Sequence, residues 1–223
     1  MSNHNIVLVI AAHPDDEVLG CGATIVKHVQ AGDLVHILII GDGLESREKT
    51  KESVHKNTLN SSRILGASSF EILGYPACRF YEKGLLAVTK EIEKKINLLK
   101  PDIIYLHHFG DMHMDHQAVY EASLPALRPV AGFSVKRILC YEVPSATDWV
   151  PPIQDGRIFK PTVFINIEKT FLTKIKALEC YKDEMRPFPH PRSPEALKVY
   201  AQRWGIISGC QMAEAFELMR EIT

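Results

Sequence analysis

The sequence lacks paired cysteines, an excess of charge of either sign and any apolar run long enough to cross a membrane. Its five cysteines stand singly, with no CxxC pair, which argues against a disulfide framework and a thiolate zinc site. Lys and Arg number 26 against 27 Asp and Glu, so the basic footprint of a nucleic-acid binder is absent. The apolar segment near the N-terminus has no basic leader and no small-residue cleavage site. We therefore expect a cytoplasmic protein with no transmembrane segment and no nucleic-acid partner.

The length and composition are those of an ordinary globular chain. The 223 residues fit one domain, which we expect to span 1–223, and a domain of this size buries a substantial core. Hydrophobic residues make up 46% and charged residues 24%. With isolated cysteines, any bound metal would have to be held by histidines and carboxylates.

Apolar runs typical of buried strands alternate with segments whose apolar residues recur at helical spacing. The predicted strands cover 5–12, 34–40, 70–73, 103–108, 136–143 and 162–167. The predicted helices cover 18–30, 48–65, 85–100, 115–127, 171–185 and 195–204. This alternation predicts a Rossmann-like α/β fold: a mostly parallel sheet with helices on both faces. The proline-rich stretch 144–161 is expected to form a long loop or a lid.

Two polar clusters follow predicted strands, at the point where each strand ends. The first reads HPDDE, residues 13–17, and the second reads HHFGDMHMDH, residues 107–116. Ligands of open α/β sheets bind outside the carboxyl ends of the strands, so both clusters should face one crevice. Acids at a helix start often serve as caps, but capping does not account for His13 before them.

The spacing within the two clusters favours a metal site. His13 and Asp16, three residues apart across a tight turn, can converge on one ion and leave Asp15 free. Four histidines within ten residues, opposite this turn, are hard to explain by packing, and His116 can complete a His-Asp-His set. Such a set leaves positions open for water, as catalytic metal sites do.

The same residues carry a resemblance to a known family. The segment AAHPDDEVLGCGATI, residues 11–25, closely resembles the first signature of the zinc-dependent PIG-L/LmbE-type deacetylases. HMDH, residues 113–116, is similar to their second signature, and AEAF, residues 213–216, agrees as well. Family members remove acetyl groups from N-acetylglucosamine units in glycolipids, thiol cofactors, antibiotics and polysaccharides. The resemblance thus implies an N-acetyl sugar or glycoconjugate as the partner, and leaves open whether the chain forms a homo-oligomer.

The resemblance also implies roles for the motif residues. The implied ligands of one divalent ion per chain, zinc or iron(II), are His13, Asp16 and His116. Asp15 would be the general base that accepts a proton from the attacking water. His113 would stabilise the oxyanion or protonate the leaving amine, with Asp115 orienting its ring and raising its pKa.

Other polar residues are weaker candidates. Glu17 suits support of the helix start better than catalysis. We consider substrate contacts at six further residues: His107, His108, Asp111, Asp42, His190 and Arg192. For the first three of these, a structural role is preferred. Relatives that act on anionic substrates use an arginine in the second helix to hold a carboxylate. Here Arg47 and Lys51 are the candidates for its place, so the resemblance does not support an anionic substrate. Many relatives also have an Asp where this chain has Ala77.

Four alternative functions remain to be weighed. The first is a deacylase or amidase that acts on a non-sugar amide with the same site. Non-heme iron(II) enzymes also use two histidines and a carboxylate, but they usually occupy all-β jelly rolls. A nucleotide-binding module would need the third glycine of GxGxxG, which is missing after Gly20 and Gly22, and the acids of the first cluster would repel a pyrophosphate. A catalytically inactive binding protein is disfavoured because every motif residue is present.

Overall fold

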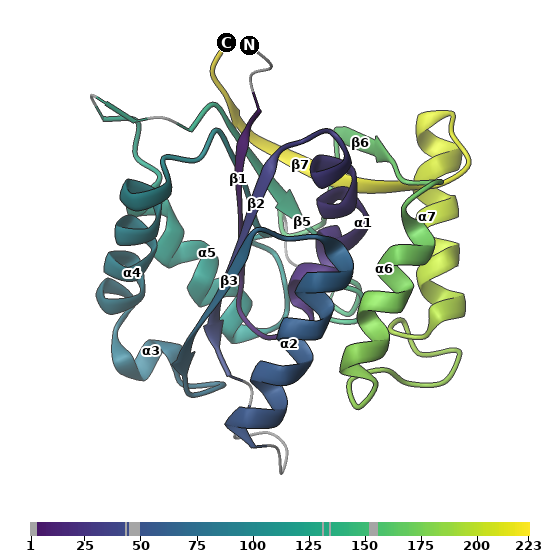
Figure 1. The fold of residues 1–223 in the computed structure, drawn as a ribbon, viewed down its shortest axis with the longest axis horizontal. Helices are drawn as coiled ribbons and strands as arrows, with labels where there is room; N and C mark the ends of the chain where they lie inside the picture. Colours follow the sequence, from purple (N-terminus) through teal and green to yellow (C-terminus); the bar gives the residue numbers. More distant parts are fainter. Residues whose placement is uncertain (1–3, 43, 45–49, 131, 134, 152–155) are drawn as a thin grey trace.

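A seven-stranded sheet in the order β3-β2-β1-β4-β5-β7-β6 runs through the centre of the molecule (Figure 1). This computed structural model describes residues 4–42, 44, 50–130, 132–133, 135–151 and 156–223. The strands are β1 (Ile6–Ala11), β2 (Leu34–Gly41), β3 (Ser69–Tyr75), β4 (Ile103–His107), β5 (Arg137–Tyr141), β6 (Val163–Asn166) and β7 (Ala213–Glu221). The first five pair in parallel, whereas β7 is antiparallel to both β5 and β6.

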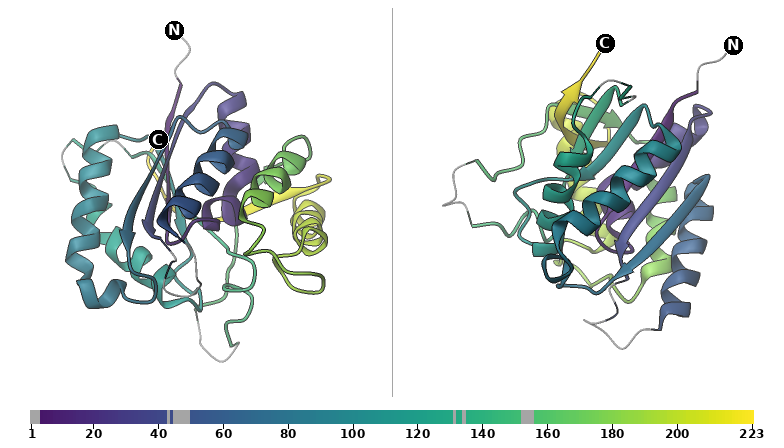
Figure 2. Two further views of the ribbon diagram at one scale, coloured as in Figure 1. Left: turned by 60° about the horizontal axis from the view of Figure 1, so that its bottom comes forward. Right: turned by 90° about the vertical axis from the view of Figure 1, so that its left-hand side faces the viewer.

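Helices cover both faces of the sheet (Figures 1 and 2). On one face lie α3 (Phe80–Lys83), α4 (Leu85–Leu99) and α5 (Met114–Ala126). The other face carries α1 (Asp16–Gln30), α2 (Lys51–Leu65), α6 (Phe171–Leu178) and α7 (Pro194–Ser208). Among the described residues, no helix is long and apolar enough to span a membrane. The predicted class, an α/β fold with a mostly parallel sheet covered on both sides, is confirmed.

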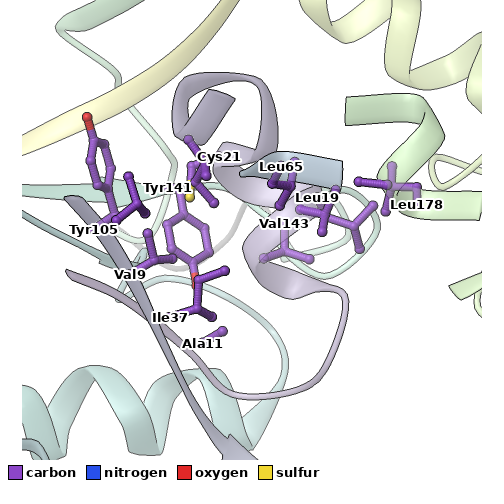
Figure 3. Packing of buried hydrophobic residues seen from close by; sticks show 14 of the residues in the cluster. Val9, Ala11, Leu19, Cys21, Ile37, Leu65, Tyr105, Tyr141, Val143 and Leu178 are labelled. Atoms are coloured by element: carbon purple, nitrogen blue, oxygen red, sulfur yellow. The ribbon is translucent and has the colours of Figure 1, made fainter. Parts of the chain in front are cut away.

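The alternation of side chains along each strand divides the core into two layers. Val9 and Ala11 of β1 pack with α1, α2 and α6, in the cluster that surrounds Tyr141 (Figure 3). Leu8 and Ile10 of the same strand point the other way, toward α4 and α5. Because both faces are buried, the strand reads as one continuous apolar run.

Several segments differ from the sequence prediction. The helix expected over 171–185 ends at Leu178 and continues only as a 3-10 turn, Glu179–Tyr181. The sequence pattern predicts no element over 213–221, where the structure has the strand β7, although its Ala, Glu, Leu and Met residues favour helices intrinsically. Pairing with β5 and β6 overrides that preference. The second helix begins at Lys51, with Thr50 as its N-cap, and positions 48 and 49 of the prediction lie outside the described residues.

The strand order reverses between β1 and β4, which pair directly with Val7 opposite Ile103. From β1 the chain proceeds outward to β2 and β3, and from β4 it proceeds to β5 on the other side. A reversal of this kind opens a crevice at the carboxyl ends of the two strands. The two polar clusters follow β1 and β4, so the topology brings both to this crevice.

A buried ion pair supports the helix that follows β1. Helix α1 departs from helical geometry at Cys21, whose φ is −143°. At this kink the backbone N–H groups of Ala23 and Thr24 donate to the two carboxylate oxygens of Glu214, at 3.1 and 2.7 Å. Lys174 of α6 lies 2.6 Å from Glu214 and also donates to the carbonyl of Leu19. The glutamate of the AEAF stretch therefore replaces the helix bonds lost at the kink.

We predict that Lys174→Met lowers the free energy of unfolding by about 3 kcal/mol, because it leaves the buried Glu214 carboxylate without its cation. Lys176→Met, an exposed change on the same helix, is the control and should have little effect. Urea denaturation at pH 7 measures both. Equal stability of the two variants would contradict a structural role for the pair.

Candidate active site

The turn after β1 holds a strained backbone. Asp15 has a φ of 119°, which side-chain-bearing residues rarely adopt and which costs about 1–3 kcal/mol. Two hydrogen bonds hold the turn: Asp15 N–H donates to Glu17 Oε2 at 3.0 Å, and His13 N–H donates to Asp16 Oδ2 at 2.8 Å. Glu17 is fully buried and also accepts from the Tyr181 hydroxyl. It supports the turn, as its position in the sequence indicated.

The loop after β4 is held by Asp111. Its Oδ1 accepts the N–H of His113 at 2.8 Å, and its backbone carbonyl accepts from the side chain of Gln117 at 2.6 Å. His113 is the N-cap of α5, and its Nδ1 accepts the N–H of Asp115 at 3.2 Å. These contacts place His113 and His116 on one side of the helix start, facing the turn after β1.

The two clusters meet at the carboxylate of Asp16. Its Oδ2 lies 3.4 Å from Nδ1 of His13 and 3.2 Å from Nε2 of His116. The other nitrogen of each ring faces an outer carboxylate: His13 Nε2 lies 2.8 Å from Asp115 Oδ2, and His116 Nδ1 lies 3.0 Å from Asp111 Oδ2. Outer carboxylates of this kind fix the tautomer of metal-binding histidines, because each holds the proton on the far nitrogen.

The polar atoms at this meeting point suit a divalent cation. Asp16 Oδ1 and both ring nitrogens of His116 are buried without an aligned hydrogen bond among the described residues. Burial opposes protonation of His116, yet Asp16 and Asp111 raise its pKa to about 10. The surrounding carboxylates thus favour a positive charge at this point, and two imidazoles with one carboxylate are a common zinc-binding set.

Within the described part of the chain, three groups of side chains have ligand atoms that lie within 4.8 Å of one another, with one atom from each residue. They are His13 with His113 and His116, Asp16 with His107 and His116, and Cys78 with His113 and Asp115. The predicted trio of His13, Asp16 and His116 is spread over the first two groups. In the second group, His107 Nε2 already accepts the N–H of Ala12 at 2.8 Å, so that nitrogen is engaged in the backbone.

Asp15 is buried and paired with an arginine from a distant part of the chain. Arg192 Nη1 donates to Asp15 Oδ2 at 3.0 Å, and Arg192 Nε donates to the hydroxyl of Ser145 at 3.2 Å. Burial raises the pKa of Asp15 to about 6, although the guanidinium of Arg192 lowers it. A carboxyl group with a pKa near neutrality suits a general base.

The environment of His113 differs from the expectation. Its pKa was expected to be raised by Asp115, but burial and the neighbouring His116 and His13 lower it to about 4. The carboxylate of Asp115 binds His13 and the N–H of Cys78 instead. His113 is therefore neutral at pH 7, and since its Nδ1 accepts a backbone N–H, its proton is on Nε2.

A cavity of about 310 Å³ opens onto this site. Its lining includes His13, Asp15 and His113, whereas Asp16, Asp115 and His116 are buried. From the proline-rich stretch 144–161, Ser145 and Trp149 contribute to the wall. Residues 152–155 of that stretch lie outside the described part of the chain, so its role as a lid stays a prediction.

The weaker candidates fall into two groups. Three of these candidates, Asp42, His190 and Arg192, line the cavity. The other three, His107, His108 and Asp111, are buried and do not line it. His108 has a structural contact, because its Nε2 lies 3.1 Å from the carbonyl of Arg157 and its Nδ1 3.0 Å from Glu217. Lys51 lines a separate groove along α2, and Arg47 lies outside the described residues.

Sequence reasoning did not find several partners of the site. It did not pair Asp111 with His116, Arg192 with Asp15, or Tyr181 with Glu17. Each contact depends on how elements far apart in the sequence pack together, so no local sequence pattern predicts it. Cys78 was read only as one of five isolated cysteines, although it lines the cavity.

Residues 8–127 match the family model described as PIG-L: GlcNAc-PI de-N-acetylase. The chain is 30% identical over 183 residues to the uncharacterized deacetylase YaiS of Escherichia coli, covering 79% of this chain and 90% of that protein. It is 25% identical to the diacetylchitobiose deacetylase of Thermococcus kodakarensis, covering 96% and 82%. The crystal structure of the conserved protein TT1542 from Thermus thermophilus is similar at a TM-score of 0.76 and 25% identity, covering 97% and 95%.

We predict that purified protein carries about one divalent ion per chain and that His116→Ala loses it. His107→Asn is the matched control, because Asn can still accept the N–H of Ala12 while offering no imidazole. Elemental analysis after dialysis measures both. Loss of the ion in His107→Asn, with retention in His116→Ala, would assign the metal to other ligands.

Proposed function

This chain belongs to the PIG-L family of de-N-acetylases, and we propose that it is a zinc-dependent hydrolase that removes the acetyl group from an N-acetylated amino sugar or glycoconjugate. The observation that carries the proposal is the meeting of His13, Asp16 and His116 beside Asp15 at one cavity. The family description and the diacetylchitobiose deacetylase relative support the choice of an N-acetyl sugar. The cavity, at about 310 Å³, is at the small end of ordinary ligand pockets, which suits a sugar unit.

In this proposal His13, Asp16 and His116 hold the ion, with Asp115 and Asp111 orienting the two rings. When bound, the ion supplies Lewis-acid chemistry, because it polarises the acyl oxygen and lowers the pKa of water from about 15.7 to about 7. Zinc fits the nitrogen and oxygen donors, and iron(II) would use the same side chains.

Asp15 acts as the general base. Its carboxylate lines the cavity, and its raised pKa lets it take a proton from the attacking water near neutral pH. The strained backbone at Asp15 directs this side chain away from Asp16, so the two neighbouring carboxylates serve different roles. The proton held on Asp15 is then available to the leaving amine.

His113 acts as a neutral hydrogen-bond donor. The N–H of Asp115 occupies its Nδ1, so its Nε2–H is free to stabilise the negative charge that develops on the acyl oxygen. A lowered pKa suits this role, because the ring keeps one fixed tautomer over the neutral pH range. Asp115 acts on His113 through its backbone and on His13 through its carboxylate.

Asp15→Asn keeps the shape of the side chain but cannot accept a proton. We expect this variant to keep its metal and to lose roughly 10²–10⁴ in kcat, the usual contribution of a general base. The measurement is acetate released from a panel of N-acetylated sugars, including diacetylchitobiose, with elemental analysis of the same samples. Near-normal turnover by metal-loaded Asp15→Asn would contradict the role of Asp15 as the base. If the wild type releases acetate only from amides that are not sugars, the proposed substrate class is wrong.

Arg192→Gln should shift the acid limb of kcat/KM to higher pH. The base works only when deprotonated, so activity is present above the pKa of Asp15 and is lost as the pH falls through it. Removing the guanidinium raises that pKa further, and activity near pH 6 should fall more than activity at pH 8. Arg186→Gln is the control, because Arg186 lines the same cavity and its hydrogen bonds to described residues go to the backbone carbonyls of Asp183 and Met185. An identical acid limb in both variants would contradict the coupling.

A further inference from the structure

A second cluster of metal-binding atoms lies beside the proposed catalytic site. The thiol of Cys78, the imidazole of His113 and the carboxylate of Asp115 offer ligand atoms within 4.8 Å of one another. We propose that these three side chains form a second, inhibitory site for a thiophilic divalent cation such as zinc or cadmium. The inhibitory effect rests on the proposed function, because it acts through His113 and Asp115.

The donor set fits such a cation. Thiolate, imidazole and carboxylate are the three ligand types of protein-bound zinc, with bonds of about 2.0–2.3 Å. Tetrahedral geometry then puts neighbouring ligand atoms roughly 3.3–3.8 Å apart, so no pair of these atoms needs to close by more than about 1.5 Å. Softer cations are favoured by the sulfur, whereas magnesium and calcium are not.

A second observation points to a ligand at this place. Asp115 is fully buried, yet its Oδ1 has no hydrogen-bond partner among the described residues. Its Oδ2 is occupied by His13 Nε2 and by the N–H of Cys78, at 2.8 and 2.7 Å. A buried carboxylate oxygen without a partner is costly, and a cation held with Cys78 would satisfy it.

The local backbone brings the thiol to this position. Cys78 lies between β3 and α3 with a φ of 61°, in the left-handed region that residues other than glycine seldom adopt. The same conformation directs its N–H to Asp115, so thiol and carboxylate are joined through one residue. Cys78 is exposed and lines the same cavity as the proposed catalytic residues.

Occupation of this site is incompatible with the proposed mechanism. Forming the metal–sulfur bond releases the thiol proton to solvent. Ligation of His113 requires either its Nδ1, now bound to the N–H of Asp115, or its Nε2, whose proton must leave. Ligation through Nε2 removes the proton that would be donated to the acyl oxygen, and ligation through Nδ1 breaks the hydrogen bond that holds the ring in position for this donation. Because a hydrogen bond or a proton is given up, the second ion should bind more weakly than the first.

A cadmium titration tests the site directly. We expect the wild type to bind two equivalents, with the ultraviolet sulfur-to-cadmium charge-transfer band rising only with the second. Acetate release should fall by roughly 10²-fold as this second site fills, the scale of one lost oxyanion donor. In Cys78→Ala the first equivalent remains, the band disappears and inhibition needs more than about tenfold more cadmium. Cys180→Ala, at a half-buried thiol outside the cluster, should behave as the wild type.

Two results would overturn the site: one equivalent bound without the band, or unchanged inhibition in Cys78→Ala. A band that rises with the first equivalent would overturn the expected order of affinities, in which the thiolate site binds its ion more weakly. The binding arm needs no substrate. If no sugar is deacetylated by the metal-loaded protein, the proposed function fails, while the cadmium stoichiometry and the band still decide whether the second site exists.

Discussion

The direct pairing of β1 with β4 is the constraint on which the site depends. These strands lie far apart in the sequence, but their parallel pairing sets Val7 opposite Ile103 and brings both following turns to one crevice. His13 and Asp16 of the turn after β1 then meet His116 of the segment after β4. Both strands are buried on two faces, and their alternate side chains pack into different layers of the core. A shift of one residue would move each side chain into the other layer, so the register of the pairing is fixed. The packing of the core therefore fixes the geometry of the polar site.

The balance of charge among the buried side chains is the second constraint on the site. Carboxylates and imidazoles are buried together, and each group changes the ionisation of its neighbours. Burial raises the pKa of Asp15 to about 6, while Asp16 and Asp111 raise that of His116 to about 10. Two adjacent aspartates thus acquire different properties: Asp16 faces the imidazoles, and Asp15 faces the cavity and Arg192. A divalent ion would compensate the charges of Asp16 and Asp111, which otherwise favour protonation of His116.

The local patterns predicted the fold class and the two motif turns, because buried strands and clustered histidines are visible within a few residues of sequence. They did not predict β7, where pairing overrides helix-forming residues, or the contact of Arg192 with Asp15 from 177 positions away. The partner of Asp115 was also missed, since adjacency in sequence suggested His113, whereas the docking of α5 against the turn after β1 presents the carboxylate to His13. Tertiary packing decides such contacts, and a single sequence does not record it.

The central claim, that one ion binds where the two turns meet, is tested most directly by anomalous diffraction from crystals loaded with one equivalent of zinc. The account predicts a single anomalous peak within bonding distance of His13 Nδ1, Asp16 Oδ2 and His116 Nε2, about 2.0–2.2 Å from each. A peak bound by His107 in place of His13, or the first equivalent beside Cys78, would contradict it.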